Sequence, residues 1–154
     1  VDKKESSYVA VLVNPKNEVL EKIKDLPFDY YQLYDCDPNQ IKIIKEKYKK
    51  KIISVVTISE EKDVLKYKNF EDISDLILFD SKGYHNSVSF DHSYLDKVKT
   101  NISIMIAGNI KLSDLLDFKN KNFCIDMSGG LETKGIKDIN KIDKFLNTVH
   151  NLNS

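Results

Sequence analysis

The chain has 154 residues, which is enough for one domain with a substantial hydrophobic core. Its 24 basic and 24 acidic residues give a formal net charge of zero. This balance argues against a nucleic-acid-binding or anionic-membrane surface, because such a surface needs a basic excess on one face. All 24 basic residues are lysines, so any phosphate must be held by ammonium groups or backbone amides rather than by guanidinium groups.

The two cysteines, Cys36 and Cys124, match no metal-ligand or redox spacing. We therefore expect a reduced, cytoplasmic chain without a metal site. The apolar runs at residues 52–58 and 102–107 are too short to span a bilayer, and no segment near the N-terminus resembles a signal peptide. These features predict a protein that associates with neither a membrane nor nucleic acid.

Strands and helices are predicted to alternate along the whole chain. Nearly continuous apolar runs are typical of strands buried on both faces, and apolar residues repeating every three to four positions are typical of amphipathic helices. The predicted strands are residues 8–13, 30–34, 52–58, 76–79, 102–106 and 123–127. The predicted helices are residues 17–26, 38–48, 60–67, 94–98, 111–118 and 136–152. We expect Asp37 to cap the second helix and Ser59 to cap the third.

Six strand–helix units in strict alternation imply a single α/β domain over residues 1–154, with a parallel sheet and right-handed crossovers. Two architectures fit this pattern: an open doubly wound sheet, or part of a (β/α)8 barrel. Both place their chemistry at the C-terminal ends of the strands, where Asp80 and Asp126 fall. A phosphate site after the last two strands favours the barrel.

Small residues follow the last two predicted strands. One turn is Ala107-Gly108-Asn109, and the other is Ser128-Gly129-Gly130. Glycines let backbone N–H groups approach an anion closely, so two such turns at adjacent strand ends suggest one shared phosphate site. Taken singly, each turn is also an ordinary connection between a strand and a helix.

Seven short segments share their order and spacing with one enzyme family. They are residues 9–14, Gln32-Leu33-Tyr34-Asp35, Leu78-Phe79-Asp80-Ser81-Lys82, Phe90-Asp91-His92, Ile106-Ala107-Gly108-Asn109, residues 126–132 and Gly135-Ile136-Lys137-Asp138. In this order they resemble motifs from the third to the eighth strand of phosphoribosylanthranilate isomerase, a (β/α)8 barrel of tryptophan biosynthesis. The resemblance implies an aldose–ketose isomerase of TIM-barrel type that binds a phosphosugar and needs no cofactor.

The reaction implied by this resemblance is an Amadori rearrangement of N-(5-phosphoribosyl)anthranilate. A general acid protonates the ribose ring oxygen, and a general base then removes the C2′ proton. Asp80 matches the position of the family's acid, a role that needs a carboxyl group with a raised pKa. From its pattern alone, Asp80 could equally cap the turn that follows it. The other residues that the resemblance places around the substrate and its phosphate are Gln32, Gly108, Asn109, Asp126, Ser128, Gly129 and Gly130.

The sequence also departs from the family pattern. The family begins with two further strand–helix units, and a Lys-Ile-Cys-Gly motif in its first strand supplies the general base. This sequence begins with Val1 and shows no such segment, so we expect about six of the eight units. Tyr34 takes the place of the His in Gln-Leu-His-Gly, and Asn109 takes that of the second Gly in Ala-Gly-Gly.

Other side chains are weaker candidates for the missing base. Cys124 lies two residues before Asp126 and faces the same side of its strand, but one layer deeper, where a buried cysteine is usually inert. Cys36 follows the second predicted strand, at the rim of the sheet. The histidines are expected to be non-catalytic residues of loops and of the terminal helix: His85, His92 and His150.

Two readings stand beside the isomerase. One is a divergent, non-catalytic barrel relative that keeps a phosphosugar-binding pocket, and the other is a doubly wound domain unrelated to the family. A six-strand part of a barrel leaves two strand edges exposed. We therefore expect the isolated chain to be poorly soluble or to associate with another chain through these edges.

Overall fold

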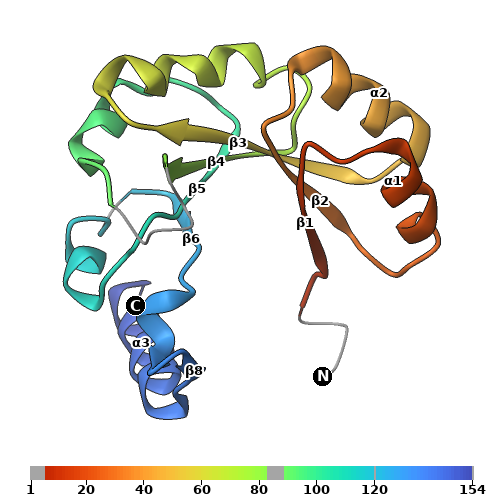
Figure 1. Ribbon diagram of the computed structural model, residues 1–154. Coiled ribbons are helices and arrows are strands. Elements are labelled where there is room, and N and C mark those ends of the chain that lie inside the picture. Colours follow the sequence, from red (N-terminus) through yellow and green to blue (C-terminus); the bar gives the residue numbers. More distant parts are fainter. Residues whose placement is uncertain (1–5, 83–88, 120, 154) are drawn as a thin grey trace.

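The computed structural model describes residues 6–82, 89–119 and 121–153. Its main feature is a six-stranded parallel sheet in the order β1-β2-β3-β4-β5-β6 (Figure 1). The strands are β1 (Val9–Val13), β2 (Tyr30–Tyr34), β3 (Lys51–Ile58), β4 (Leu76–Ser81), β5 (Ser103–Ile106) and β6 (Phe123–Ile125). The spatial order follows the chain order without reversal, as in a (β/α)8 barrel. The doubly wound reading is therefore wrong, because such a sheet reverses its order at a switch point.

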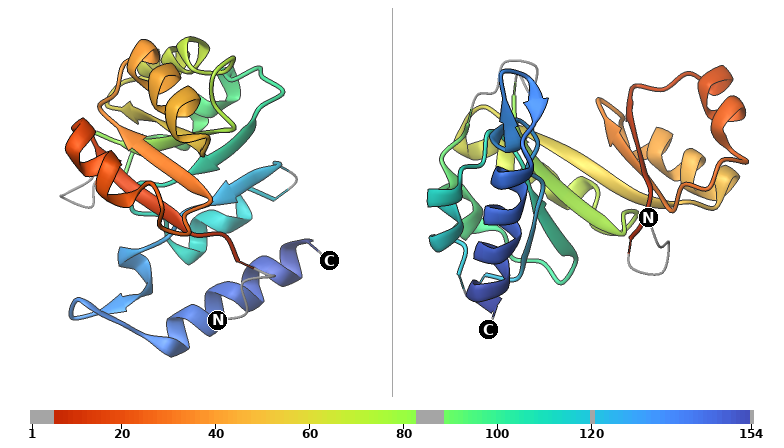
Figure 2. Two further views of the ribbon diagram at one scale, coloured as in Figure 1. Left: turned by 90° about the vertical axis from the view of Figure 1, so that its right-hand side faces the viewer. Right: turned by 90° about the horizontal axis from the view of Figure 1, so that it is seen from below.

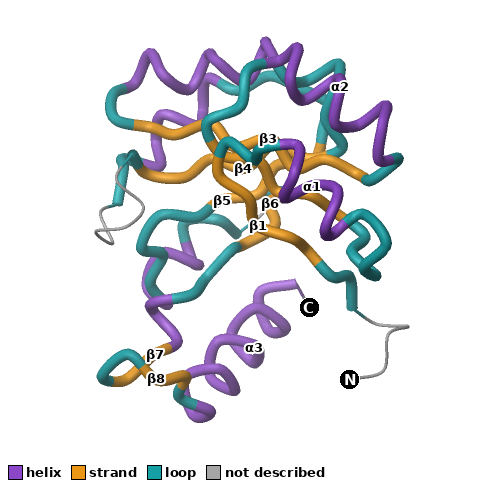
Figure 3. The backbone as a smooth tube through the Cα atoms, turned by 45° about the vertical axis from the view of Figure 1, so that its right-hand side comes forward, coloured by secondary structure: helices purple, strands orange, loops and turns teal. Residues whose placement is uncertain are grey.

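The connecting helices cover the convex face of the curved sheet (Figures 1 and 2). The α-helices are α1 (Asn17–Ile23), α2 (Pro38–Tyr48) and α3 (Ile139–Asn153), and the 3₁₀ helices are η1 (Glu61–Asn69), η3 (His92–Lys97), η4 (Leu112–Leu116) and η5 (Gly129–Leu131). Figure 3 shows the strands as an inner layer with the helices outside it. None of the described helices is both long and apolar enough to cross a bilayer.

The sheet divides the core into two sides, because successive side chains of a strand point to opposite faces. The convex side holds the clusters packed under the helices, which include Leu20, Tyr31, Ile41, Val64, Tyr67, Ile77, Phe79 and Leu115. The concave side holds a smaller cluster of Tyr34, Ile53, Val55, Leu78 and Ala107. The clusters on the convex and concave sides determine which side chains of each strand point toward the concave face.

The concave face of β1 is open. Val9, Val11 and Val13 are 37%, 61% and 49% exposed, whereas Ala10, between the first two, is buried under the helices. Among the described strands, β1 pairs with β2 alone and β6 pairs with β5 alone. The two outer strands therefore present unpaired edges and, at β1, a row of apolar side chains without an opposite partner.

The helix caps follow short-range polar contacts. The Asp37 Oδ1 atom accepts a hydrogen bond from Gln40 N at 2.9 Å, and Pro38 occupies the first helical position, as predicted. The third cap differs from the prediction. Asp63 Oδ2 accepts from both Ser59 N (2.9 Å) and Glu60 N (3.1 Å), so η1 begins after Glu60. The prediction of Ser59 as the cap was wrong, because Glu60 is the N-cap residue. The Asp63 carboxylate accepts hydrogen bonds from the backbone amides of both Glu60 and Ser59.

The last predicted helix begins too early. Residues 136–137 instead form β8 (Ile136–Lys137), which pairs antiparallel with β7 (Glu132–Thr133). The two residues between them, Lys134 and Gly135, both have positive φ angles, as a tight two-residue hairpin turn requires. Lys-Gly is not among the common residue pairs for this turn, and Ile136 fits the apolar spacing of the helix that follows it. For these two reasons the sequence pattern did not predict the hairpin.

Truncation of a fully buried side chain on the convex face should destabilise the fold far more than truncation on the open face of β1. Ile77 has no exposed surface, so Ile77→Ala should lower the free energy of unfolding by about 2–5 kcal/mol. Val11→Ala, in which another branched aliphatic side chain is shortened, should cost about 0.5 kcal/mol or less. Urea unfolding at low protein concentration measures both, and equal losses would contradict the assignment of the two faces.

Candidate active site

A cavity of about 220 Å³ lies at the C-terminal ends of the strands. Its lining comes from the ends of β2, β4, β5 and β6 and from the two small-residue turns. The lining residues are Tyr34, Asp80, Ser81, Ala107, Gly108, Asn109, Ile110, Asp126, Ser128, Gly129 and Gly130. Segments that are almost 100 residues apart in the sequence thus meet around one space.

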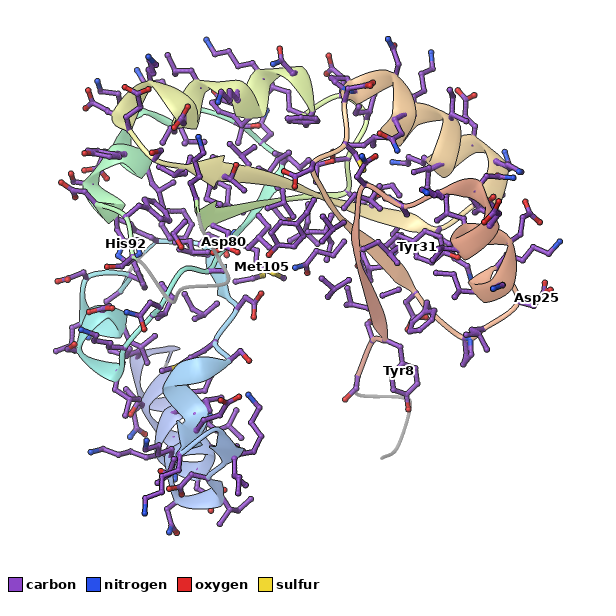
Figure 4. The ribbon with its side chains drawn as sticks, in the orientation of Figure 1. Tyr8, Asp25, Tyr31, Asp80, His92 and Met105 are labelled. Carbon is purple, nitrogen blue, oxygen red and sulfur yellow. The ribbon has the colours of Figure 1, made fainter. Side chains whose placement is uncertain are left out.

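The parallel register explains why these residues meet. Thr57 of β3 is the register partner of Asp80 in β4. Beyond the end of β5, Ala107 N donates to Phe79 O at 2.8 Å, and beyond the end of β6, Asp126 N donates to Ile106 O at 2.8 Å. The residues at or just beyond the ends of β3, β4, β5 and β6 therefore lie side by side across the sheet, and their side chains face its concave side. Figure 4 shows Asp80 at this end of β4.

Asp80 is the most enclosed carboxyl group of the cavity, with 5% of its surface exposed. Its Oδ2 atom accepts a hydrogen bond from the Tyr34 hydroxyl at 2.8 Å, and its Oδ1 atom accepts one from Ser81 N at 2.7 Å. Burial raises the pKa of Asp80, while these hydrogen bonds act against the rise by stabilising the carboxylate. The net direction is upward, so the group keeps its proton to a higher pH than a free aspartate.

Asp126 is the second carboxyl group of the cavity. Burial raises its pKa, the negative charge of Asp80 raises it further, and the ammonium group of Lys137 opposes the rise. Both carboxyl groups of the cavity thus have a raised pKa, mainly because burial favours the protonated form. A protonated carboxyl group is what general acid catalysis requires.

The two small-residue turns form another part of the cavity lining. Gly108 has a φ angle of +94°, and a Cβ atom at this position would lie 3.0 Å from Ser81 N and 3.2 Å from Ser81 Cβ. A Cβ atom on Gly130 would lie 2.9 Å from the carbonyl oxygen of Ile110. The backbone of one turn thus packs directly against the neighbouring segments, and only glycine fits at either position without displacement.

Several amide groups of these turns are available to a ligand. Within the described residues, the N–H groups of Gly108, Asn109 and Gly129 donate to no backbone acceptor. Lys137 lies behind the second turn, where its Nζ atom is 3.0 Å from both the carbonyl oxygen and the hydroxyl of Ser128 and 2.6 Å from Glu132 Oε1. Free amides near an ammonium group are an arrangement that suits an anion.

Seven of the eight predicted site residues line the cavity: Asp80, Gly108, Asn109, Asp126, Ser128, Gly129 and Gly130. Gln32 is not in the lining. Gln32 is buried two residues before Tyr34 in β2, farther from the C-terminal end of the strand. Its Nε2 atom donates a hydrogen bond to the Tyr34 hydroxyl at 3.4 Å. The sequence interpretation missed Tyr34, Ser81 and Lys137. Tyr34 could have been found, because it stands at the polar position of the Gln-Leu-His-Gly motif and shares a strand face with Gln32.

The other candidates for a base are less suited to the role. Cys36 Sγ donates to Tyr34 O at 3.4 Å, and burial raises the pKa of this thiol to about 11, which disfavours a thiolate. Cys124 is exposed, so the expectation of a buried cysteine was wrong. It is the register partner of Met105, two residues before Asp126, in β6, which pairs only with β5 among the described strands.

The two histidines within the described residues, His92 and His150, are not in the cavity lining. The His92 ring packs between those of Phe90 and Phe118, with centroids 4.9 and 5.1 Å away, and its burial lowers its pKa. His150 is an exposed residue of α3, and His85 lies outside the described residues. No group of three or more His, Cys, Asp or Glu side chains among the described residues is placed to hold a metal ion.

Comparison with known proteins identifies the family. The family model for N-(5'phosphoribosyl)anthranilate (PRA) isomerase matches residues 1–148. The isomerase of Rhizobium johnstonii is 30% identical over 158 residues, an alignment that covers 95% of this chain and 71% of the relative. That of Rhizobium leguminosarum bv. trifolii is 31% identical over 153 residues, covering 92% of this chain and 69% of the relative.

Solved structures give the same answer for the fold. Phosphoribosylanthranilate isomerase from Thermus thermophilus superposes with a TM-score of 0.78 at 16% identity, covering 95% of this chain and 73% of that one. An isomerase structure in complex with reduced 1-(o-carboxyphenylamino)-1-deoxyribulose 5-phosphate superposes with a TM-score of 0.70 at 21% identity, over 93% of this chain and 71% of that one. The prediction of a TIM-barrel type fold is confirmed, and the chain belongs to the N-(5′-phosphoribosyl)anthranilate isomerase family.

Proposed function

We propose that this protein catalyses the Amadori rearrangement of N-(5-phosphoribosyl)anthranilate to the 1-deoxyribulose 5-phosphate product in tryptophan biosynthesis, with Asp80 as the general acid. The observation that carries this proposal is the position of Asp80. It shares one cavity with the Gly108 and Gly129 turns, so an acid and an anion cradle face the same space. Family membership supplies the identity of the reaction.

The glycine turns would hold the phosphate of the substrate. The amides of Gly108, Asn109 and Gly129, which donate to no backbone acceptor among the described residues, suit its oxygens in a chain without arginine. Lys137 contacts Ser128 in the second turn and is itself paired with Glu132. Phosphate binding at these turns would direct the ribose toward Asp80, which lines the same cavity. Positioning of this kind lowers the barrier because the reacting groups meet without a further loss of freedom.

Asp80 would start the reaction by giving its proton to the ring oxygen of the ribose. The bond between this oxygen and C1′ then breaks, and the anthranilate nitrogen supplies the electron pair that forms the C=N bond. Removal of the C2′ proton gives the enolamine, which tautomerises to the ketose. Asp126 lines the same cavity and is proposed to bind the substrate beside the acid.

The described residues supply the acid and the phosphate cradle of this site. In the family pattern, the acceptor for the C2′ proton belongs to a strand that would lie at the open edge beside β1. The chain spans about 70% of the length of its Rhizobium relatives. We propose that the open side of the sheet is covered in the working protein, and that a second copy of the chain covers it when the 154-residue chain is isolated.

Replacement of the proposed acid should abolish most of the activity. Asp80→Asn keeps the size of the side chain but cannot donate the carboxyl proton, so kcat should fall by roughly 10²- to 10⁴-fold. In the unmodified protein, kcat should decline as pH rises through the raised pKa of Asp80, because the acid works only when protonated. An isomerase assay on the full product of the gene measures both effects.

The matched control for this test is Asp72→Asn. Asp72 is an exposed aspartate in the loop before β4, outside the cavity, so its replacement should leave kcat unchanged. Unchanged activity in the Asp80→Asn variant would rule out the acid role. Phosphosugar binding without turnover in the unmodified protein would instead favour the non-catalytic relative.

A methyl group at the first glycine turn should weaken substrate binding. Both Gly108→Ala and Gly135→Ala place alanine at a positive φ angle and share that strain, about 1 kcal/mol. Only the Cβ atom at Gly108 meets the backbone of Ser81, whereas nothing lies within 4 Å of the one at Gly135. Gly108→Ala should raise KM by roughly tenfold, equivalent to about 1.4 kcal/mol, and Gly135→Ala should change it less than twofold. Equal KM values in the two variants would remove Gly108 from the phosphate site.

The isolated chain should associate through its open side. Sedimentation of the 17.8 kDa chain should give a dimer or larger species, because unpaired strand edges and the exposed valines of β1 favour contact with another chain. Val11→Lys places a charge on this face and should shift the population toward monomer. The control is Ile43→Lys, which alters an exposed residue of α2 on the convex side. A well-behaved monomer at all concentrations would contradict the proposed association through the open side of the sheet.

A further inference from the structure

Tyr34 contacts the proposed acid directly. It is the last residue of β2, it is 6% exposed, and it lines the cavity. Its hydroxyl donates to Asp80 Oδ2 at 2.8 Å, so two buried polar groups from separate strands are joined by one short hydrogen bond. The family pattern has a histidine at this position, which makes the contact a feature of this chain's own sequence.

The direction of this hydrogen bond is set by the neighbouring groups. Gln32 Nε2 donates to the Tyr34 oxygen, which leaves the Tyr34 proton for Asp80. The other carboxyl oxygen of Asp80 accepts from Ser81 N at 2.7 Å. Each oxygen of Asp80 therefore already accepts one hydrogen bond from the protein, and the carboxyl plane is held from two sides.

We propose that Tyr34 is a positioning residue, which orients the Asp80 carboxyl so that its acidic proton points into the cavity, and that Gln32 supports Tyr34 in this role. The proposal rests on the function proposed above, since it assigns Tyr34 a part in the action of that acid. Tyr34 itself is not the proton donor. Burial and the charge of Asp80 raise the pKa of its hydroxyl above the usual range, so it stays a neutral hydrogen-bond donor.

The electrostatics of the cavity agree with this role. The hydrogen bond from Tyr34 favours the carboxylate form of Asp80, while burial favours the protonated form. Of the elements packed against Asp80, β3 presents Thr57 and the end of β5 presents Ala107, neither of which titrates. The only other titratable group facing Asp80 among the described residues of the lining is Asp126, whose raised pKa is opposed by the charge of Lys137. Loss of the Tyr34 hydroxyl should therefore raise the pKa of Asp80.

The test is Tyr34→Phe, with Tyr31→Phe as the matched control. Both remove one hydroxyl from β2 and keep the aromatic ring in its cluster. Tyr31 is buried on the helix-covered side of the sheet (Figure 4). Its hydroxyl has no hydrogen-bond partner among the described residues. Tyr31→Phe should leave Asp80 unaffected. Gln32→Leu, which removes the support of Tyr34, should act in the same direction as Tyr34→Phe but more weakly.

Two readouts are measured on each variant. The first is the titration of the Asp80 carboxyl carbon by NMR, which does not depend on activity. Tyr34→Phe should move its midpoint upward by about one pH unit. The second is the pH profile of kcat in the isomerase assay. The decline at high pH should move upward by the same amount, and kcat on the low-pH plateau should fall roughly three- to tenfold because a weaker acid donates its proton less readily.

The outcomes separate this proposal from the one on which it rests. An unmoved Asp80 titration in both Tyr34→Phe and Gln32→Leu overturns the positioning role, whatever the activity. A titration that moves while the pH profile of kcat stays in place overturns the acid role of Asp80, and with it the part of Tyr34 in catalysis. Equal shifts in Tyr34→Phe and Tyr31→Phe would assign the effect to the strand as a whole and would also overturn the proposal.

Discussion

The parallel register of the sheet is the constraint on which the candidate site depends. Hydrogen bonds between neighbouring strands place Thr57, Asp80, Ala107 and Asp126 at one level on the concave face. A slip of one residue in any strand would turn these side chains to the helix-covered face, because side chains alternate along a strand. The helices prevent such a slip by burying the other set of positions, such as Phe79. The packing under the helices thereby determines the geometry of the cavity.

Burial at the strand ends gives the site its chemistry. A carboxyl group in water is ionised at neutral pH. Burial of Asp80 and Asp126 favours the protonated form and raises the pKa of both, and the charge of Asp80 raises the pKa of Asp126 further. The same enclosure strengthens each hydrogen bond to the carboxyl group. In the same lining, the amides of Gly108, Asn109 and Gly129 donate to no backbone acceptor among the described residues, in a chain without arginine. The proposed acid and the proposed phosphate site thus lie in one short layer of backbone and side chains.

The curvature of the sheet has a second consequence. Helices cover the convex face, and side chains from β2 to β5 fill the concave face. Within the part of the chain that the structure describes, β1 and β6 each have a neighbouring strand on one side only. The valines of β1 are therefore exposed although they sit in a position typical of a barrel interior. Cys124 is exposed at the other edge for the same reason.

The sequence by itself determined the alternation of strands and helices, the parallel barrel-type sheet as one of two choices, and seven of the residues around the cavity. Apolar runs and small-residue turns are local patterns, and each reflects a local physical requirement. The tertiary structure decided the strand order, which excluded the doubly wound sheet, and the hydrogen bond that joins Tyr34 to Asp80. It also moved Gln32 out of the lining and revealed the hairpin hidden in a helical pattern. These features depend on contacts between residues distant in the chain, which periodicity along one segment does not encode.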